Sequence, residues 1–379
     1  MNQELNSALV RPLILVAMLW GVLLNGFFLY VPYMTGLGQV GESALATAIG
    51  WLVLCVVAIF VGRNYHGFLS NKGPQRITAL VLVTLAAIGV ILDSVIAGPW
   101  GWIALSAALS ITLSFLNSRI VGANGSHSLA KVSALLGATP LIGLLIVAAS
   151  FSFAFVQDFY PALAGASVLI AIIDIIATPT HSHSSGDDAG RVNILPTSLL
   201  SYGFLLGFGV ALVNTNVYAR ITEVIGGESS VVAGLSAQLI FLASLVGVVA
   251  SLVVGLRRLE NFPRVTLARL AAAVVSLGVL VLILADRILA IGIAGFLVGI
   301  GFGLTNGVEL RLVQAASAGS RERTALFGSF LAATTLPYVA AAVVGIQIAA
   351  LGWGTTPILV AALIASVLGL VSIRTKLLD

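Results

Sequence analysis

Long apolar runs limit what this chain can fold into more than any other feature of its sequence. A helix needs roughly 20 consecutive apolar residues to cross the hydrocarbon core of a membrane. Short polar segments connect most of the runs, so the sequence predicts an all-α integral membrane protein with twelve transmembrane helices and no extramembrane domain. The twelve runs lie near 13–33, 42–62, 77–97, 99–117, 132–155, 159–179, 198–219, 229–254, 266–285, 288–309, 325–348 and 354–373.

Too few polar residues are present to cover the surface of a soluble protein. The chain has 379 residues, of which 59% are hydrophobic and only 8% are charged, whereas a typical soluble domain has about 25% charged residues. The outer surface must therefore face lipid. Because the formal net charge is only +4 and the basic residues are scattered, we expect no nucleic-acid binding. The single cysteine, Cys55, excludes an intrachain disulfide.

The distribution of lysine and arginine predicts the orientation in the membrane. Cytoplasmic loops of membrane proteins are enriched in these residues. If the N-terminus is inside, all of the 18 basic residues except Arg220 and Arg287 fall in segments on the inner side. A missed or additional helix would scramble this asymmetry. We therefore expect both termini in the cytoplasm, and the short chain suggests a bacterial inner (plasma) membrane.

An internal repeat divides the chain into two halves. The tripeptide GES opens the second run at 41–43 and recurs at the eighth run at 227–229. One occurrence could be chance, because small polar and acidic residues suit helix N-termini. Each copy is followed by an apolar helix and a basic loop, which reads GFLSNKGPQR in the first copy and GLRRLENFPR in the second. Because each copy has an even number of crossings, both have the same orientation, as in transporters built from parallel repeats. The predicted units are a six-helix bundle at 1–180, a cytoplasmic linker at 181–197 and a second six-helix bundle at 198–379.

The first of these loops resembles the signature of the major facilitator superfamily of secondary transporters, which lies between helices two and three. That signature reads Gly, any residue, Leu, small, Asp, basic, any residue, Gly, then basic residues. The corresponding positions here are Gly67, Leu69, Ser70, Asn71, Lys72, Gly73 and Arg76. The resemblance implies twelve helices in two parallel six-helix halves and a cytoplasmic gate to which this loop contributes.

Two departures from the signature affect the predicted gate. Asn71 stands where the family has Asp, and the spacing before Gly73 is one residue short. In the family, the Asp and the basic residues lock the gate by charge pairing, so Asn71 implies a weaker or differently built lock. From the residues alone, Gly67 and Gly73 predict a tight turn, and Lys72 and Arg76 could serve only to anchor a cytoplasmic loop.

The fifth run resembles a second pattern of the superfamily. Many of its exporters carry Gly-Pro-x-x-Gly-Gly in helix five, and this chain has GATPLIG there, with Gly137, Pro140 and Gly143. Pro-x-x-Gly fits the pattern, but Thr139 and Leu144 replace its flanking glycines. The resemblance implies an exporter. The alternative is an ordinary kink, because proline removes a backbone hydrogen-bond donor and bends a helix.

Helices one, four, seven and ten line the central cavity in the superfamily, so the resemblance makes the polar residues of the corresponding runs candidates for substrate binding. They are Asn25, Tyr30 and Tyr33; Ser106, Ser110, Ser114 and Asn117; Asn214 and Asn216; and Asn306. Spacings of four, four and three place the second group on one helix face, which could line a wet cavity or form a small-residue packing seam. In the tenth run, Gly295, Gly299 and Gly303 predict close helix packing.

Ionisable residues inside membrane spans are candidates for function. Asp174, in the sixth run, could couple transport to protons or could simply reach the inner interface. Glu309 and Arg311 end the tenth run and are two residues apart, so they do not face each other. We expect them at the inner gate, and we take Glu309 as the main candidate for proton coupling. The second basic loop adds Gly255, Arg257 and Arg258 to the predicted gate.

The sequence predicts a transporter rather than an enzyme. It contains no phosphate-binding loop ending in Gly-Lys-Ser/Thr, no metal-ligand cluster and no recognisable catalytic triad, so we expect no cofactor, metal or catalytic residue. The favoured function is secondary export of an amphipathic, drug-like or metabolite compound, with protons as candidate coupling ions, as in an efflux antiporter. An uptake permease or uniporter and a non-transporting membrane scaffold are the alternatives. The expected partners are a small-molecule substrate, membrane lipid and protons, and the expected state is a monomer.

Overall fold

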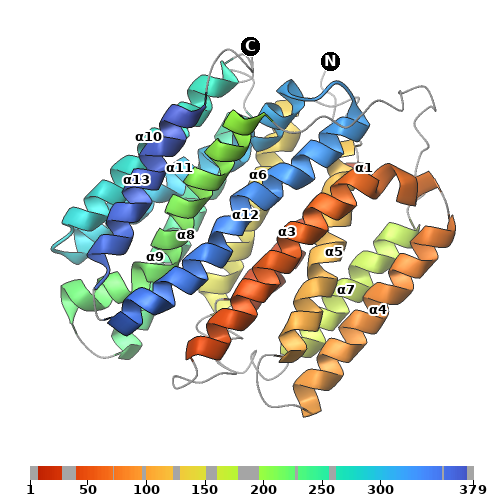
Figure 1. The fold of residues 1–379 in the computed structure, drawn as a ribbon, viewed down its shortest axis with the longest axis horizontal. Coiled ribbons are helices and arrows are strands. Elements are labelled where there is room, and N and C mark those ends of the chain that lie inside the picture. Colours follow the sequence, from red (N-terminus) through yellow and green to blue (C-terminus); the bar gives the residue numbers. More distant parts are fainter. Residues whose placement is uncertain are drawn as a thin grey trace.

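Helices account for the regular structure of the described residues. The computed structural model describes residues 7–27, 40–70, 72–95, 100–122, 129–150, 160–177, 196–226, 229–255, 262–351 and 354–373. Its helices are α1 (Ser7–Asn25), α3 (Val40–Ser70), α4 (Lys72–Val95), α5 (Trp100–Gly122), α6 (Leu129–Ser150), α7 (Tyr160–Ala177), α8 (Thr197–Ile225), α9 (Ser229–Val254), α10 (Arg264–Leu284), α11 (Ile288–Ala315), α12 (Ser320–Leu351) and α13 (Thr356–Ser372). Each predicted apolar run overlaps one of these helices (Figure 1).

The helices have the length and surface of membrane-spanning segments. Eight of them are long and apolar enough to cross a membrane, namely α3, α4, α5, α8, α9, α10, α11 and α12. The other helices are apolar but shorter over their described residues. Large hydrophobic side chains such as Leu80, Leu289 and Val371 are at least 67% exposed, and a contiguous apolar surface of this kind suits lipid. The predicted all-α membrane architecture is confirmed.

The helices form two groups that meet along two seams. We refer to α1–α7 as the first half and to α8–α13 as the second half; in Figure 1 the first half lies mostly on the right and the second mostly on the left. One seam joins α3 to α12, and the other joins α6 to α9 and α11. The second helix of each half therefore packs against the fifth helix of the other half, as a two-fold axis between parallel halves requires.

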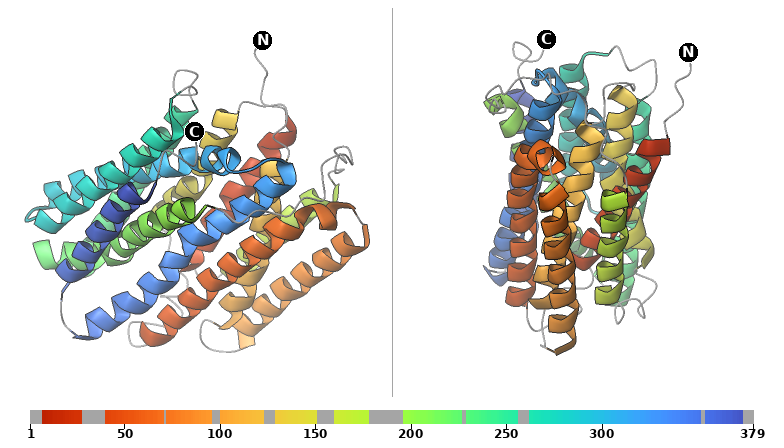
Figure 2. Two further views of the ribbon diagram at one scale, coloured as in Figure 1. Left: turned by 45° about the horizontal axis from the view of Figure 1, so that its top comes forward. Right: turned by 90° about the vertical axis from the view of Figure 1, so that its right-hand side faces the viewer.

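The described basic residues gather at one end of the bundle. We call the end where α1 begins and α13 ends the inner end; it is the upper end in Figure 1, and Figure 2 shows it from two further directions. The alternating helix directions place the described lysines and arginines in the inner part of the bundle, with the exceptions of Arg220 and Arg287. The inner end is the one that the positive-inside pattern predicts to be cytoplasmic.

Gly67 and Gly73 both lie inside helices. Helix α3 continues through Gly67 to Ser70, and α4 begins at Lys72 and includes Gly73. The expectation that Gly67 and Gly73 form a tight turn is therefore wrong, because both glycines lie inside helices. Pro74 stands in the first turn of α4, where its missing N–H would have no helical partner in any case. Among the described glycines, a positive φ occurs at Gly226 and Gly354.

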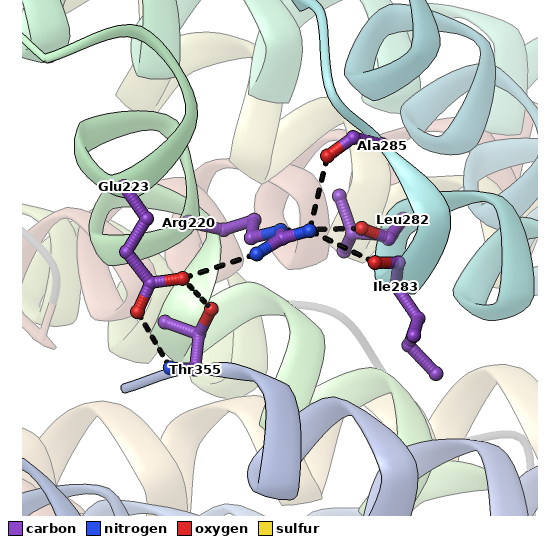
Figure 3. Close-up of polar contacts among 6 residues, drawn as sticks. All are labelled: Arg220, Glu223, Leu282, Ile283, Ala285 and Thr355. Carbon is purple, nitrogen blue, oxygen red and sulfur yellow. Dashed lines mark hydrogen bonds and ion pairs between the residues drawn. The ribbon is translucent and has the colours of Figure 1, made fainter. Parts of the chain in front are cut away.

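A polar cluster ties together three helix ends of the second half at the end opposite the inner one (Figure 3). Arg220, in the last turns of α8, donates hydrogen bonds to the final carbonyl groups of α10: from Nε to Leu282 at 3.3 Å, and from Nη2 to Ile283 at 2.8 Å and Ala285 at 3.0 Å. The last carbonyl groups of a helix have no partner within it. Arg220 therefore caps α10 from α8.

Glu223 connects the same cluster to the start of α13. Its Oε1 accepts a hydrogen bond from the backbone N–H of Thr355 at 2.6 Å, its Oε2 accepts one from the Thr355 hydroxyl, and Arg220 Nη1 lies 3.2 Å from Oε2. Glu223 lies beyond the membrane-spanning part of α8, Thr197–Val217. Burial opposes its ionisation, but the hydrogen bonds from Thr355 and the ion pair with Arg220 outweigh that effect and lower the pKa of Glu223. The ionised carboxylate thus stabilises the fold.

We predict that Glu223→Gln lowers the unfolding temperature at pH 7, by an amount that corresponds to about 1 kcal/mol for a charge-assisted hydrogen-bond network that is partly exposed. Because the pKa of Glu223 is lower in the folded protein, the wild type has its full advantage above the ordinary glutamate pKa of about 4.3 and loses it as the pH falls through the lowered value. Thermal unfolding of both proteins from pH 3 to pH 7 measures this. Asp286→Asn, at an exposed ion pair with 3.8 Å between Arg287 Nε and Asp286 Oδ2, is the control. An equal deficit at every pH would contradict the prediction.

Candidate functional site

A buried polar face of α5 is the first component of the candidate site. Ser106, Ser110, Ser114 and Asn117 are each at most 3% exposed. The Ser106 hydroxyl donates to the carbonyl of Ile103 at 2.9 Å. It lies against α3, since a methyl group added at Gly50 would come 3.3 Å from the hydroxyl oxygen. The predicted stripe is therefore turned into the protein and away from lipid.

Three polar atoms on this face have no hydrogen-bond partner among the residues that the structure describes. They are Ser110 Oγ, Ser114 Oγ and Asn117 Oδ1, and all are buried. A neighbouring hydroxyl on the same helix is satisfied, because Thr112 donates to the carbonyl of Ala108 at 2.7 Å. Leaving a buried polar group unpaired costs about 1–3 kcal/mol, and most such groups in proteins are paired. A face with three of them is suited to a polar ligand or to water, which favours the cavity interpretation over a packing seam.

A row of aromatic rings crosses between the halves next to this face. Tyr338 of α12 stacks on Trp51 of α3 with 4.7 Å between ring centroids, and Trp51 stacks on Phe27 at 4.6 Å. Phe27 meets Trp102 of α5 edge to face at 5.6 Å. Trp102 lies four residues before Ser106 and therefore on the same face of α5. We call Phe27, Trp51, Trp102 and Tyr338 the aromatic row.

Asn214, a cavity candidate of α8, contacts the aromatic row through its side chain. The amide nitrogen of Asn214 donates to the Tyr338 hydroxyl at 3.4 Å. Sequence reasoning predicted Asn214 but missed the aromatic row. Trp51 and Tyr338 lie inside apolar runs, whereas Trp and Tyr in membrane proteins gather at the two interfaces. Their position in the middle of apolar runs, away from the interfaces, is the sequence feature that could have identified them.

The remaining cavity candidates have other environments. Asn216 is buried, and its amide donates to the carbonyl oxygen four residues earlier at 2.8 Å and to the Thr215 hydroxyl at 3.0 Å, so its own helix satisfies it. Asn25 and Asn306 are 7% and 8% exposed. Two candidates lie outside the described residues, Tyr30 and Tyr33.

Hydroxyl-to-carbonyl hydrogen bonds join the halves at the inner end. Ser133 of α6 donates to the carbonyl of Gly307 in α11 at 2.6 Å. Ser251 of α9 donates to the carbonyl of Ala134 in α6 at 2.9 Å. We call this set of Ser133, Ala134, Ser251 and Gly307 the inner gate. It is built from residues that were not among the predicted gate residues, and it lies at the same end of the bundle as Gly255 and Arg311.

Salt bridges do not contribute to the junction between the halves in the part of the chain that the structure describes. The ion pairs there are Arg119–Asp174, Arg220–Glu223 and Asp286–Arg287, and each lies within one half.

The structure accounts for part of the predicted gate. Arg311 is buried and donates to the carbonyl of Phe262 at 3.2 Å, within the second half. Gly255 directly follows α9 and packs on α6, where a methyl group would lie 2.9 Å from the Cβ of Ala134. Arg76 is exposed. Asn71, Arg257 and Arg258 lie outside the described residues, as do the side chains of Leu69, Ser70 and Lys72.

Glu309 is partly buried near the inner end of α11. Its Oε1 is buried and has no hydrogen-bond partner within the described part of the chain, which does not include its predicted partners Arg257 and Arg258. An ionised carboxylate is costly to bury without a partner. A carboxyl group in such a position is suited to gaining and releasing a proton.

Asp174 has a partner that sequence reasoning missed. Arg119 Nη1 lies 3.2 Å from Asp174 Oδ2, and the two side chains are 19% and 13% exposed. The pair joins the inner ends of α5 and α7. Because Arg119 balances its charge, a structural role for Asp174 is favoured over proton coupling.

Glycines of the exporter-like pattern are packing positions. A methyl group at Gly137 would lie 2.2 Å from the backbone oxygen of Asn306, across the junction between the halves. One at Gly143 would lie 2.8 Å from the backbone nitrogen of Gly21 in α1. Pro140 lies between the two glycines inside α6. Gly137 is therefore required for closure of the inner end, and Gly143 for packing within the first half.

Close packing at the glycines of α11 is confirmed at two of three positions. Methyl groups at Gly299 and Gly303 would lie 2.3 Å and 2.1 Å from the carbonyl oxygens of Ala243 and Gly247 in α9. A methyl group at Gly295 would meet nothing within 4 Å. The prediction is wrong at Gly295 because α9 and α11 approach each other closely only from Gly299 toward the inner end.

The fold is similar to that of solved major facilitator transporters. The crystal structure of the human organic anion transporter MFSD10 (TETRAN) matches 98% of this chain and 100% of its own, with a TM-score of 0.70 and 12% identity. The proton:xylose symporter XylE, bound to 6-bromo-6-deoxy-D-glucose, matches 97% of this chain and 95% of its own, with a TM-score of 0.67 and 12% identity. No protein-family model and no curated protein sequence matches the chain. The predicted major facilitator fold is confirmed.

We predict that Gly137→Val holds the inner gate open. The added side chain would overlap the backbone of Asn306, so α6 and α11 must separate, at a cost typical of overpacking of about 1–3 kcal/mol. Labelling of a cysteine introduced at Ser251, in a Cys55→Ser background, by a membrane-impermeant maleimide should become severalfold faster from the inner side. Gly295→Val, which meets open space on α11, is the matched control and should not change labelling. Equal labelling rates in the two variants would show that the contact at Gly137 does not control the gate.

Proposed function

We propose that this chain, which has the major facilitator fold, is a secondary transporter that moves a small solute by alternating access. The observation that carries the proposal is the unpaired polar face of α5 beside the aromatic row. It is buried, it carries hydroxyl and amide groups, and it lies next to the junction of the halves. We assign 1–180 and 198–379 as the two bundles that move relative to each other, and 181–197 as their cytoplasmic linker.

The chemistry of this site supports an amphipathic, drug-like or metabolite solute. The aromatic row offers ring faces for stacking, while Ser110, Ser114, Asn117 and Asn214 offer uncharged hydrogen-bonding groups. A multiply charged anion would require cationic partners, so the proposed cargo is neutral or cationic. One similar structure is described as an organic anion transporter and the other as a proton:xylose symporter. Because one fold carries such different cargoes, the cargo proposed for this chain is argued from the residues of its own site.

Export is the proposed direction, and it rests on the exporter-like pattern at Gly137, Pro140 and Gly143. We propose a monomeric efflux protein of a bacterial plasma membrane. An uptake permease or uniporter would use the same site in the opposite direction or without coupling. A non-transporting scaffold would need neither the unpaired polar atoms nor a gate that opens.

The inner gate supports a moving junction. Its opening breaks the hydrogen bonds Ser133–Gly307 and Ser251–Ala134, each of which contributes about 1 kcal/mol net. Coupling to protons is assigned to Glu309, which follows Asn306 and Gly307 toward the inner end of α11.

We predict that Ser110→Ala/Ser114→Ala separates binding from stability. Removing unpaired buried hydroxyls should leave the unfolding temperature of the free protein unchanged or higher, because no hydrogen bond is lost. The stabilisation by any compound that raises the unfolding temperature of the wild type should fall, with an affinity loss of about tenfold for each hydrogen bond of about 1.4 kcal/mol. Thermal shift of purified protein against a panel of neutral and cationic amphipathic compounds measures both.

The matched control for this prediction is Thr112→Val, which removes a hydroxyl that is already satisfied within α5; it should leave compound binding intact. Asn214→Ala should weaken binding as the double variant does. If no compound stabilises the wild type, the scaffold alternative is favoured. If compounds stabilise all variants equally, the solute binds elsewhere.

We predict that Glu309→Gln uncouples transport from protons. In proteoliposomes, an imposed pH gradient should drive a bound compound across the membrane with the wild type but not with the variant, which should retain exchange without a gradient. Asp174→Asn is the comparison, because Arg119 already pairs with that carboxylate. Loss of gradient-driven flux in Asp174→Asn alone would move the coupling site to α7, and gradient-independent flux in the wild type would favour a uniporter.

A further inference from the structure

An apolar groove opens on the outside of the first half, away from the junction between the halves. Its walls come from the inner parts of α3, α4, α5 and α7. On α5 the groove is lined by Phe115 and Arg119. Arg119 lies two residues after Asn117, which is about 200° around the helix. The groove and the candidate solute site therefore lie on opposite sides of α5.

The groove changes from polar to apolar along its length. On α4 the lining residues, from the inner end toward the membrane interior, are Gln75, Thr78, Ala79 and Leu82. The α7 wall consists of isoleucines, with Ile176 nearest the inner end and Ile172 deepest. A polar entrance followed by an apolar slot matches a molecule with a polar head and a hydrocarbon chain.

The groove entrance is suited to a phosphate group. Arg119 lies there, and a guanidinium group has five N–H donors, so its ion pair with Asp174 at 3.2 Å does not exhaust it. Helix α4 begins at Lys72, so its first turn, whose backbone N–H groups favour anions, lies at the same entrance. Gln75 and Thr78 of that helix add side-chain donors.

The charge balance at the entrance favours an anion over a zwitterion. Arg119 and Asp174 cancel each other, while Arg76, next to Gln75 in the first turns of α4, is exposed and unbalanced by either of them. In the predicted orientation these residues face the inner leaflet. Basic pockets between transmembrane helices on the cytoplasmic side are typical sites for anionic lipid headgroups.

We propose that this groove is a binding site for an anionic phospholipid of the inner leaflet. The phosphate contacts Arg119, Gln75 and the first turn of α4, and an acyl chain lies along Ala79, Leu82 and Ile172. The site is separate from the solute site, so it is independent of whether the chain transports. The partner expected from the sequence was lipid in general, whereas the groove specifies the headgroup charge and the position.

Native mass spectrometry of the purified protein, equilibrated with equal amounts of phosphatidylglycerol and phosphatidylcholine, tests the proposal. The wild type should retain phosphatidylglycerol in severalfold preference. Arg119→Gln/Asp174→Asn removes the cation that contacts the phosphate without leaving an unpaired charge, and it should reduce the preference; adding Arg76→Gln, which removes the remaining positive charge of the entrance, should bring it to about one. Ala79→Phe fills the slot and should abolish retention of both lipids. Ala87→Phe, at an exposed position further along α4, is the matched control and should behave as the wild type.

Equal retention of the two lipids by the wild type would overturn the proposal, and so would undiminished retention in Ala79→Phe. Should the double variant fail to fold, the comparison of lipid retention by Ala79→Phe and by Ala87→Phe still tests whether lipid binds in the groove. Inorganic phosphate is added in a separate arm. Displacement of phosphatidylglycerol by millimolar phosphate would identify a free-anion site and overturn the assignment to a lipid, whereas resistance to phosphate supports it.

Discussion

The absence of water inside a bilayer is the constraint on which the rest of this structure depends. Every backbone polar group there must be satisfied within the protein, which leaves helices as the elements for a chain of this kind. Lipid also removes the hydrophobic drive that holds helices together in water, so helices associate through close packing of small residues. This protein follows that rule in its closest approaches, where Gly328 meets the backbone of Ala58, Gly303 that of Gly247, and Gly137 that of Asn306.

Close packing at glycines occurs both within the halves and between them. The described ion pairs occur only within a half. The ion pairs of the described chain lie within a half: Arg119–Asp174 ties α5 to α7, and Arg220–Glu223 belongs to the cluster that ties α8 to α10 and α13. Between the halves, the described polar contacts at the inner end are serine hydroxyls on backbone carbonyls. The described ion pairs thus hold helices together within a half, whereas the inner end of the junction is held by uncharged hydrogen bonds and close packing. This division suits two bodies that move relative to each other.

Local features of the sequence predicted the helices, whereas contacts between residues distant in sequence could not be predicted from it. Apolar run length placed a helix on every predicted span, and the basic residues predicted which ends lie together, because both signals are carried by neighbouring residues. The ends were less certain: α11 continues to Ala315, beyond the predicted end at 309, because a helix that leaves the membrane need not stop there. Partners distant in sequence left no trace, since nothing near Asp174 points to Arg119 and nothing near Trp51 points to Tyr338. Asn216 shows the opposite error, because a polar residue on a cavity-lining helix can be satisfied by its own backbone.

Helix α5 connects the parts of the first half that carry chemistry. Ser110, Ser114 and Asn117 lie on the side turned into the protein, while Phe115 and Arg119 lie on the side of the groove. A helix is rigid on the scale of one turn, so a rotation that brings the unpaired hydroxyls toward a solute also moves the guanidinium of Arg119 relative to Asp174 and the α4 terminus. If binding at one of the two proposed sites rotates α5, it changes the affinity of the other site, and the effect is reciprocal by thermodynamic linkage. Helix α5 therefore carries the unpaired polar atoms of the proposed solute site on one face and the Arg119–Asp174 ion pair of the proposed lipid site on the other.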